Sequence, residues 1–323
     1  MPLALGLVFI LLRVTGNPVE ASLGDRLSDV ELQRRLAISG LNRPIFEQFM
    51  TYFESILSWD FGRSFKDVSV NDLIWRHITA TIEVSSLGLV VLGFCFLTLG
   101  SLAAWKPGGA IDRIIRVSAI VTFALPAFLA ASLIQLVFRL FVPAFPTSGR
   151  ASLSELIRWQ TDLYQTGFVT VDALIGGDTV LFFEALAHLL LPAIALVFIS
   201  GTLIRVFRDS LVQELASEPL QSALRRGVTP RRLFFRHAFM PAIPAALAAY
   251  GITVGSLVTG VVFVERVFEI RGLGYLLVDA VLARDFMVVQ GIFIVTFFVV
   301  AAINVLVDLV IVIVDRRQMK ALL

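Results

Sequence analysis

The residues best placed to do chemistry lie in one short basic stretch of the sequence. Residues 223–244 read ALRRGVTPRRLFFRHAFMPAIP and contain five arginines, one histidine and no acidic residue. Guanidinium groups form charge-assisted hydrogen bonds with carboxylates, so this stretch is suited to docking an acidic partner. The same charge would arise if the stretch only marked the cytoplasmic side of a membrane protein. Both interpretations are open at this point.

The usual catalytic patterns are absent from the chain. It contains no G-x-S-x-G, no H-E-x-x-H and no paired C-x-x-C. His77, His188 and His237 lie on different segments, so we expect no shared metal site. The phosphate-binding pattern G-x-x-x-x-G-K-[ST] is also missing, so any ATP must be bound by a partner chain. We therefore expect no catalytic residues and no enzyme activity of its own.

Long apolar segments make up most of the sequence around this stretch. The chain is 57% hydrophobic and 16% charged, against roughly 45–50% and 25% in ordinary domains. Segments without Asp, Glu, Lys or Arg that reach the roughly 20 residues of a membrane span are 84–105, 117–138, 185–204, 237–264 and 286–307. Residues 1–12 are apolar but shorter, and they fit a signal peptide poorly because no basic residue precedes Arg13. We expect an all-α membrane protein with about six spans, the first of them short.

Prolines and small residues within these segments predict bends and close contacts. Pro126, Pro192, Pro241 and Pro244 each remove an amide donor, which bends a helix. The G-x-x-x-G pattern that begins at Gly251 lets two helices approach closely. That contact can lie within one subunit or between two, and the sequence leaves both open.

The distribution of charge assigns the segments between spans to the two sides of the membrane. Segment 203–238 has seven arginines against three acidic residues, whereas 143–183 has two arginines against four acidic residues. Cytoplasmic segments are enriched in Lys and Arg. We therefore expect a multi-pass protein with both termini in the cytoplasm, and a single membrane domain over 1–323.

The external segments differ in their expected structure. Segment 15–80 is the first, with capping spacing at 28–31, a helix that starts at Pro44, and a cap at Ser69 for a third helix. One face of the Pro44 helix would carry Ile45, Phe49, Phe53 and Ile56. The second external loop, 143–183, contains several glycines and prolines and is predicted to be irregular. Segment 265–285 forms the external connection between the last two spans.

Local rules predict a helix, an elbow and a second helix in the basic stretch. Residues 218–226 suit a short helix, and Gly227 can end it in a left-handed conformation. Thr229 and Pro230 have the types of an N-cap and a first helical residue. The next helix would continue through Leu233, Phe234 and His237. A helix-turn-helix can bind DNA, but tethering between two spans makes entry into a groove awkward, so no nucleic acid is expected.

At these residues the chain resembles a known family. SEPLQSALRRG at 217–227, followed by Arg231, Arg232 and His237, resembles the cytoplasmic coupling loop of ABC-importer permeases, specifically the dipeptide, oligopeptide and nickel group. The order of further motifs supports this resemblance: LNRP at 41–44, WDFGRSF at 59–65, and GSLVTGVVFVERVFEIRGLGYLLVDAVLARDFMVVQ at 255–290. The departures are a short N-terminus, Pro219 in place of an aromatic residue, Pro241 in place of Asn, and Arg271 and Met287 in place of prolines.

The resemblance implies the type I importer architecture and a coupling role for segment 205–238. The residues expected to contact an ATPase are Glu218, Leu220, Ser222, Ala223, Arg226, Gly227, Arg231, Arg232 and His237. The implied partners are a second homologous permease, usually a different chain, two cytoplasmic ABC ATPases that bind ATP and Mg, an extracytoplasmic solute-binding protein, and the lipid bilayer. The implied location is the cytoplasmic (inner) membrane of a bacterium or archaeon.

The sequence defines the transported solute less closely than the architecture. Short peptides are the first expectation and nickel or another small solute the second, and no substrate-binding residue can be named from the sequence. An ATP-independent secondary transporter is a more distant alternative. It would need ion-coupling charges inside the bilayer, and none is apparent at the middle of a span.

Overall fold

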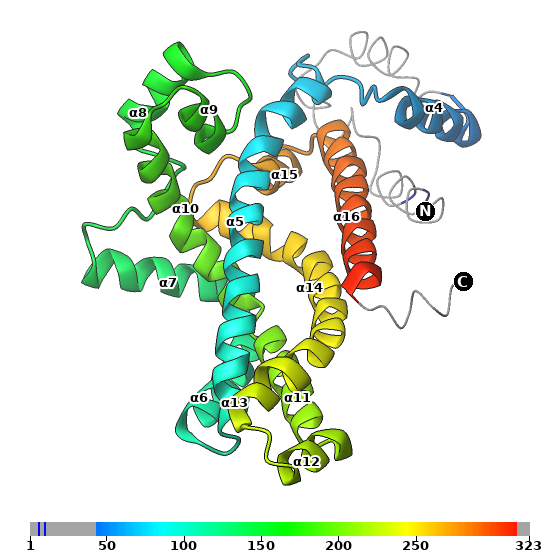
Figure 1. The fold of residues 1–323 in the computed structure, drawn as a ribbon. Coiled ribbons are helices and arrows are strands. Elements are labelled where there is room, and N and C mark those ends of the chain that lie inside the picture. Colours follow the sequence, from blue (N-terminus) through cyan, green and yellow to red (C-terminus); the bar gives the residue numbers. More distant parts are fainter. Residues whose placement is uncertain (1–5, 7–9, 11–42, 315–323) are drawn as a thin grey trace. The chain divides into compact units, whose positions relative to one another are not determined.

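The computed structural model describes residues 6, 10 and 43–314, and this part of the chain is built from helices (Figure 1). The helices of regular α type are α4 (Ile45–Ser58), α5 (Val70–Trp105), α6 (Ala110–Ala124), α7 (Ala127–Phe141), α8 (Leu153–Arg158), α9 (Val169–Ile175), α10 (Thr179–Ile199), α11 (Thr202–Leu215), α12 (Glu218–Arg225), α13 (Pro230–Arg232), α14 (Met240–Val267), α15 (Leu273–Leu282) and α16 (Phe286–Val314). Two π-helical segments, η1 (Trp159–Leu163) and η2 (Leu233–Phe239), lie between them. The all-α prediction is confirmed.

The spans agree with the expected apolar segments. Val70–Trp105, Thr179–Ile199 and Phe286–Val307 are each long and apolar enough to cross a membrane. Two further pairs of helices qualify together, each bent at a short break: Ala110–Thr122 with Ala127–Phe141, and Pro230–Pro244 with Ala246–Gly255. The described residues therefore contain up to five spans. The expected cap at 28–31 lies outside the described residues. The expected short span at 1–12 also lies outside them, except for residues 6 and 10.

The bend expected at Pro126, within the apolar segment 117–138, is confirmed. Helix α6 ends at Ala124, and α7 begins at Ala127 with a bend of 118° between the two. The cause is Pro126, because a proline ring pushes the preceding residue out of the helical region. Leu125 accordingly has φ −86° and ψ 128°, which is extended backbone. The second bent pair turns by 41° just after Pro244.

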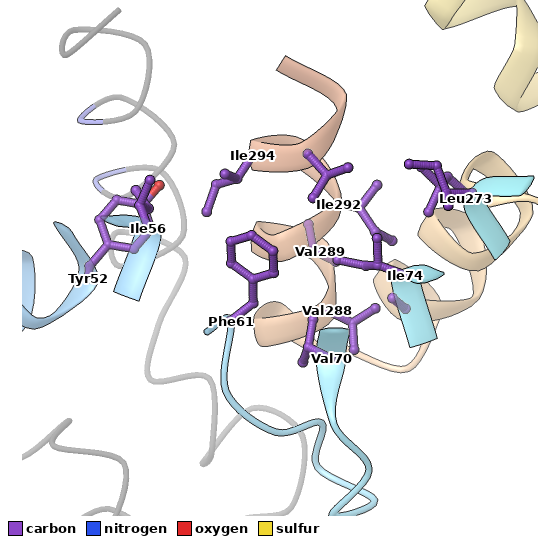
Figure 2. Close-up of a cluster of buried hydrophobic side chains, with 13 residues drawn as sticks. Tyr52, Ile56, Phe61, Val70, Ile74, Leu273, Val288, Val289, Ile292 and Ile294 are labelled. Carbon is purple, nitrogen blue, oxygen red and sulfur yellow. The ribbon is translucent and has the colours of Figure 1, made fainter. Parts of the chain in front are cut away.

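The chain forms two compact units. The first contains the described residues up to Thr81 together with Arg271–Val299. Its buried core joins α4, the start of α5, α15 and the start of α16, and Figure 2 shows Phe61, Val70 and Ile74 turned toward Val288 and Val289. The predicted helix after Pro44 and the predicted cap are confirmed, since the Asp72 amide donates to Ser69 Oγ at 3.4 Å.

The second unit contains Ile82–Ile270 and the chain from Val300. In it, the expectation that the loop 143–183 is irregular is wrong, because α8, η1 and α9 fold around their own small core. Its centre is the buried carboxylate of Asp172, which accepts hydrogen bonds from Trp159 Nε1 at 3.0 Å and from the Thr166 amide at 2.9 Å. A buried ion pair ties this segment to α5, with Arg150 Nη1 3.0 Å from Glu83 Oε2.

Of the two glycines in the G-x-x-x-G pattern, Gly251 lies close to another helix of the same chain, and Gly255 does not. A Cβ on Gly251 would lie 2.9 Å from Val307 Cγ1, so α14 and α16 approach closely there. A Cβ on Gly255 would meet no atom within 4 Å. The packing interpretation is therefore supported at Gly251.

Candidate coupling site

Helix α11 packs against the η2 segment of the basic stretch. Its residues Phe207 and Leu211 are fully buried, and Phe207 has aromatic neighbours on both sides. The ring centroid of Phe207 lies 5.4 Å from that of Phe96 in α5 and 5.6 Å from that of Phe239 in η2, both in edge-to-face geometry. These contacts fix α11 between the end of α5 and the segment that follows α12.

A buried ion pair joins α11 to the start of α6. Arg208 Nε and Nη2 donate to the two carboxylate oxygens of Asp112 at 2.8 and 2.9 Å. The same carboxylate accepts the Gly108 amide at 2.7 Å, so it also holds the turn between α5 and α6. Burial acts to lower the pKa of Arg208, but hydrogen bonds to Asp209 and Asp112 raise it above its ordinary value, so the guanidinium stays charged.

Helix α12 ends in a Schellman motif at the predicted residue. Gly227 has φ +83°, in the left-handed region that favours glycine. The Gly227 amide donates to the Leu224 carbonyl at 3.0 Å, and the Val228 amide donates to the Ala223 carbonyl at 3.3 Å. This is the 5→2 and 6→1 pair of bonds that defines the motif. The elbow predicted from the sequence is confirmed.

The second arm of the elbow begins as predicted and continues differently. Thr229 is the N-cap and Pro230 the first residue of α13. The helix then widens into the π-helical segment η2, which ends directly before Met240. A proline ring clashes with the carbonyl four residues earlier in an α-helix, and for Pro241 that carbonyl belongs to His237. Phe234 of η2 packs edge-to-face on Trp105, with ring centroids 5.0 Å apart.

Seven of the nine predicted coupling residues are exposed. Leu220 is buried and anchors α12 to the protein, and Ala223 is half-buried. The exposed residues are Glu218, Ser222, Arg226, Gly227, Arg231, Arg232 and His237. The structure thus exposes residues on both arms of the elbow, and it leaves the small residue Ala223 half-buried on α12.

The five arginines of the stretch are exposed. Arg225, Arg226, Arg231, Arg232 and Arg236 form no ion pair within the part of the chain that the structure describes. Three arginines elsewhere in the same unit, Arg150, Arg158 and Arg208, do form ion pairs. Exposed guanidinium groups without ion pairs are free to form charge-assisted hydrogen bonds with carboxylates.

The sequence interpretation missed the Asp112–Arg208 pair, because it used both residues only as indicators of the cytoplasmic side. A usable signal was present, since Asp112 is the single acidic residue in a turn that also contains Lys106, Arg113 and Arg116. A lone carboxylate among basic residues indicates a specific partner.

Comparisons with known proteins agree with this geometry. A family described as the binding-protein-dependent transport system inner membrane component matches residues 97–320, more than half of the chain. The chain belongs to this family. It is a multi-pass permease subunit of an ABC importer, with the type I permease fold, and the family works with an ATPase and a solute-binding protein.

Similar proteins cover nearly the whole permease. The di/tripeptide transport system permease protein DppB of Pseudomonas aeruginosa (strain UCBPP-PA14) is 29% identical over 310 residues, which are 94% of this chain and 90% of that protein. The dipeptide transport system permease protein DppB of Escherichia coli (strain K12) is 29% identical over 307 residues, with coverage of 94% and 90%. The nickel import system permease protein NikB of Staphylococcus aureus (strain bovine RF122 / ET3-1) is 28% identical over 319 residues, with coverage of 97% and 86%.

Proposed function

We propose that this permease forms half of the translocation pathway of an ATP-driven importer for short peptides, and that α12 and Gly227 couple it to a cytoplasmic ATPase. The observation that carries the coupling role is the elbow itself. A short helix ends at a left-handed Gly227 and presents unpaired arginines on its outward side. The surface is built for contact with a protein rich in carboxylates.

The proposed mechanism is mechanical. ATP and Mg are bound by two partner ATPases, and their closure on ATP moves the docked α12. A bound partner shifts a two-state protein only through different contacts in the two states. The elbow is placed to transmit such a difference because its first arm, α12, follows α11, and its second arm, α13 with η2, leads into α14. The permease would thereby alternate between inward-open and outward-open states.

The remaining partners and the topology complete the proposal. A second homologous permease, a different chain in this family's usual arrangement, supplies the other half of the pathway, and an extracytoplasmic solute-binding protein delivers the solute. Both termini lie in the cytoplasm. The excess of arginine in 203–238 and the acidic excess in 143–183 support this orientation.

Peptides are the proposed solute because two similar proteins at 29% identity are named for dipeptide or di/tripeptide transport. Nickel is the second candidate, and the observation in its favour is the nickel permease at 28% identity over 319 residues. The difference between 29% and 28% does not separate the two solutes. A direct uptake measurement does.

The test is uptake in a strain that lacks this gene, with a labelled tripeptide and with labelled nickel. The intact gene should restore peptide uptake, whereas Gly227→Pro should not, because proline locks φ near −65°. Ala223→Trp should also fail, because a large side chain crowds the docked helix. Gly227→Asn is the matched control: asparagine tolerates the left-handed region, and a Cβ there meets no atom within 4 Å.

Each outcome has a definite meaning once membrane levels of the variants are shown to be equal. Full uptake by Gly227→Pro or Ala223→Trp would overturn the coupling role. Loss of nickel uptake with unchanged peptide uptake would keep the permease and replace the solute.

A further inference from the structure

Helix α4 carries three distinct side-chain stripes. Positions i, i+4, i+7 and i+11 lie on one face of a helix. From residue 46 this spacing gives Phe46, Met50, Phe53 and Leu57, and from residue 47 it gives Glu47, Thr51, Glu54 and Ser58. The first stripe is wholly apolar and the second wholly polar. A third stripe starts at residue 45: Phe49, Tyr52 and Ile56 are packed, and Ile45 at the start of the helix is exposed.

The apolar stripe is uncovered in the structure. Phe46 is 66% exposed, Met50 43%, Phe53 42% and Leu57 69%. The stripe runs about 16 Å along the helix, at 1.5 Å per residue. Four large apolar side chains on one face are more than the scattered exposed residues that need no explanation.

The packed stripe places α4 beside a membrane span. Tyr52 and Ile56 are each 5% exposed and belong to the same buried cluster as Val288, Ile292 and Ile294 of α16 (Figure 2). These α16 residues lie roughly 3–12 Å from the start of the span at Phe286. Figure 1 shows α4 running across the direction of α16 rather than along it. A helix that crosses a span near its end lies along the plane of the bilayer.

We propose that α4 is a membrane-interface helix whose stripe Phe46, Met50, Phe53 and Leu57 inserts into the acyl chains of the outer leaflet. The inference rests on the proposed topology, which places the start of α16 at the outer face. The stripes lie about 100° apart on the helix, so the packed, apolar and polar faces meet protein, lipid and water in turn. On α16, Phe293 is 44% exposed within the same stretch as the buried residues Val288 and Ile294.

A lipid surface fits this face better than a protein partner does. The stripe offers no hydrogen-bonding group, whereas protein interfaces surround an apolar centre with polar contacts. The polar face carries Glu47 and Glu54, so anionic headgroups do not attract it. Insertion is therefore driven by apolar burial alone, and it should be the same in neutral and in anionic lipid.

The experiment compares both stripes of one helix in the full transporter complex, reconstituted in nanodiscs. Cys95 is the single cysteine of the chain, so Cys95→Ser, combined with partner subunits whose own cysteines are replaced, gives a background for labelling. A nitroxide is attached through Met50→Cys or Phe53→Cys on the apolar stripe, and through Glu47→Cys or Glu54→Cys on the polar stripe. Spin-label accessibility is measured to oxygen, which concentrates in lipid, and to chromium oxalate, which stays in water.

The expected result is a reversal between the stripes. Labels at 50 and 53 should collide more with oxygen than with chromium oxalate, and labels at 47 and 54 should do the opposite, in neutral and anionic nanodiscs alike. Low accessibility to both reagents at 50 and 53 would mean that protein covers the stripe, and the proposal would fall. Equal chromium oxalate accessibility on both stripes would mean that water covers it, and this result would also overturn the proposal. Neither readout depends on transport, so failure here is distinct from failure of the proposed function.

Discussion

Breaking the Asp112–Arg208 pair tests whether α11 and α6 move as one body. The perturbations are Arg208→Met and Asp112→Leu, singly and together. Each single change removes one partner of a bidentate pair in which the Asp112 carboxylate is fully buried and the Arg208 side chain is 13% exposed. The double change replaces both charges with apolar groups of similar length.

The magnitude follows from what each change leaves behind. Removing one partner of a buried pair costs about 3–5 kcal/mol, because the other charge stays buried. Arg208→Met leaves Asp112 with the Gly108 amide and with Arg116, whose Nε lies 3.6 Å away. We therefore expect the lower end, about 3 kcal/mol, or roughly a hundredfold in the folding equilibrium. Asp112→Leu should cost less, since Arg208 keeps Asp209 at 2.8 Å.

The assay is equilibrium unfolding of the purified complex in mixed micelles, with ATP hydrolysis and uptake measured on the same preparations. The double variant should be more stable than the sum of the single effects by about 2 kcal/mol or more. Arg205→Met is the matched control on the same helix. Arg205 forms an exposed pair with Asp209 at 3.6 Å, and such pairs are worth about 0–1 kcal/mol.

Two results would refute this reasoning. A cost below about 1 kcal/mol for Arg208→Met would show that water reaches the pair and screens it. Additive single effects would show that the two residues stabilise the fold separately. The pair can also be tested for a role in transmitting movement. In that case a stable double variant should still hydrolyse ATP but should transport fewer solute molecules per ATP, because an apolar contact lacks the fixed direction of the ion pair.

Two further predictions concern packing and pH. A Cβ on Gly201 would lie 2.6 Å from Thr122 Oγ1, so Gly201→Ala should destabilise the chain by about 1–3 kcal/mol. Gly93→Ala is the control and should not destabilise it, because no atom lies within 4 Å of the new Cβ. Equal stability of the two variants in the unfolding assay would contradict this prediction. Burial acts to raise the pKa of Asp172, but hydrogen bonds from Thr166 and Trp159 lower it below its ordinary value. Its stabilisation is therefore fully present above an unfolded-state pKa of about 3.9 and is lost as pH falls through the folded-state value. After correction for the intrinsic exchange rate at each pH, the protection of amides in 151–185 against hydrogen exchange should fall below about pH 4, and Asp172→Asn should lower it already at neutral pH; protection that does not change with pH in the unchanged chain would exclude this.

The parts of the fold that the sequence predicted depend on neighbours in the chain. Gly227, Thr229 and Pro230 each act on their own backbone, so the elbow could be placed to the residue. The same holds for the cap at Ser69. The bend at Pro126 was predicted from an equally local rule, the missing amide donor of proline, although its angle of 118° was not.

The parts that were missed depend on contacts between distant residues. Arg208 and Asp112 are 96 positions apart, and Glu83 and Thr170 are 87 positions apart. No periodicity or spacing links such pairs. The folded core of 143–183 was missed for a related reason: its glycines and prolines indicate turns, while Asp172 organises the backbone between those turns through its carboxylate.

The contacts around α11 define how a displacement of α12 would travel on the proposed coupling. Two contacts join α11 to α6, one near each end of α6. Gly201 lies against Thr122, and Arg208 binds Asp112. Two separated contacts prevent rotation about either one, so α11 and α6 should shift together. The shift then reaches Leu125, where α6 ends and Pro126 provides no amide to continue the helical bonds. On the proposed coupling, a rigid clamp on one side and a backbone break on the other would make 125–126 the place where a displacement of α12 changes an angle within the membrane.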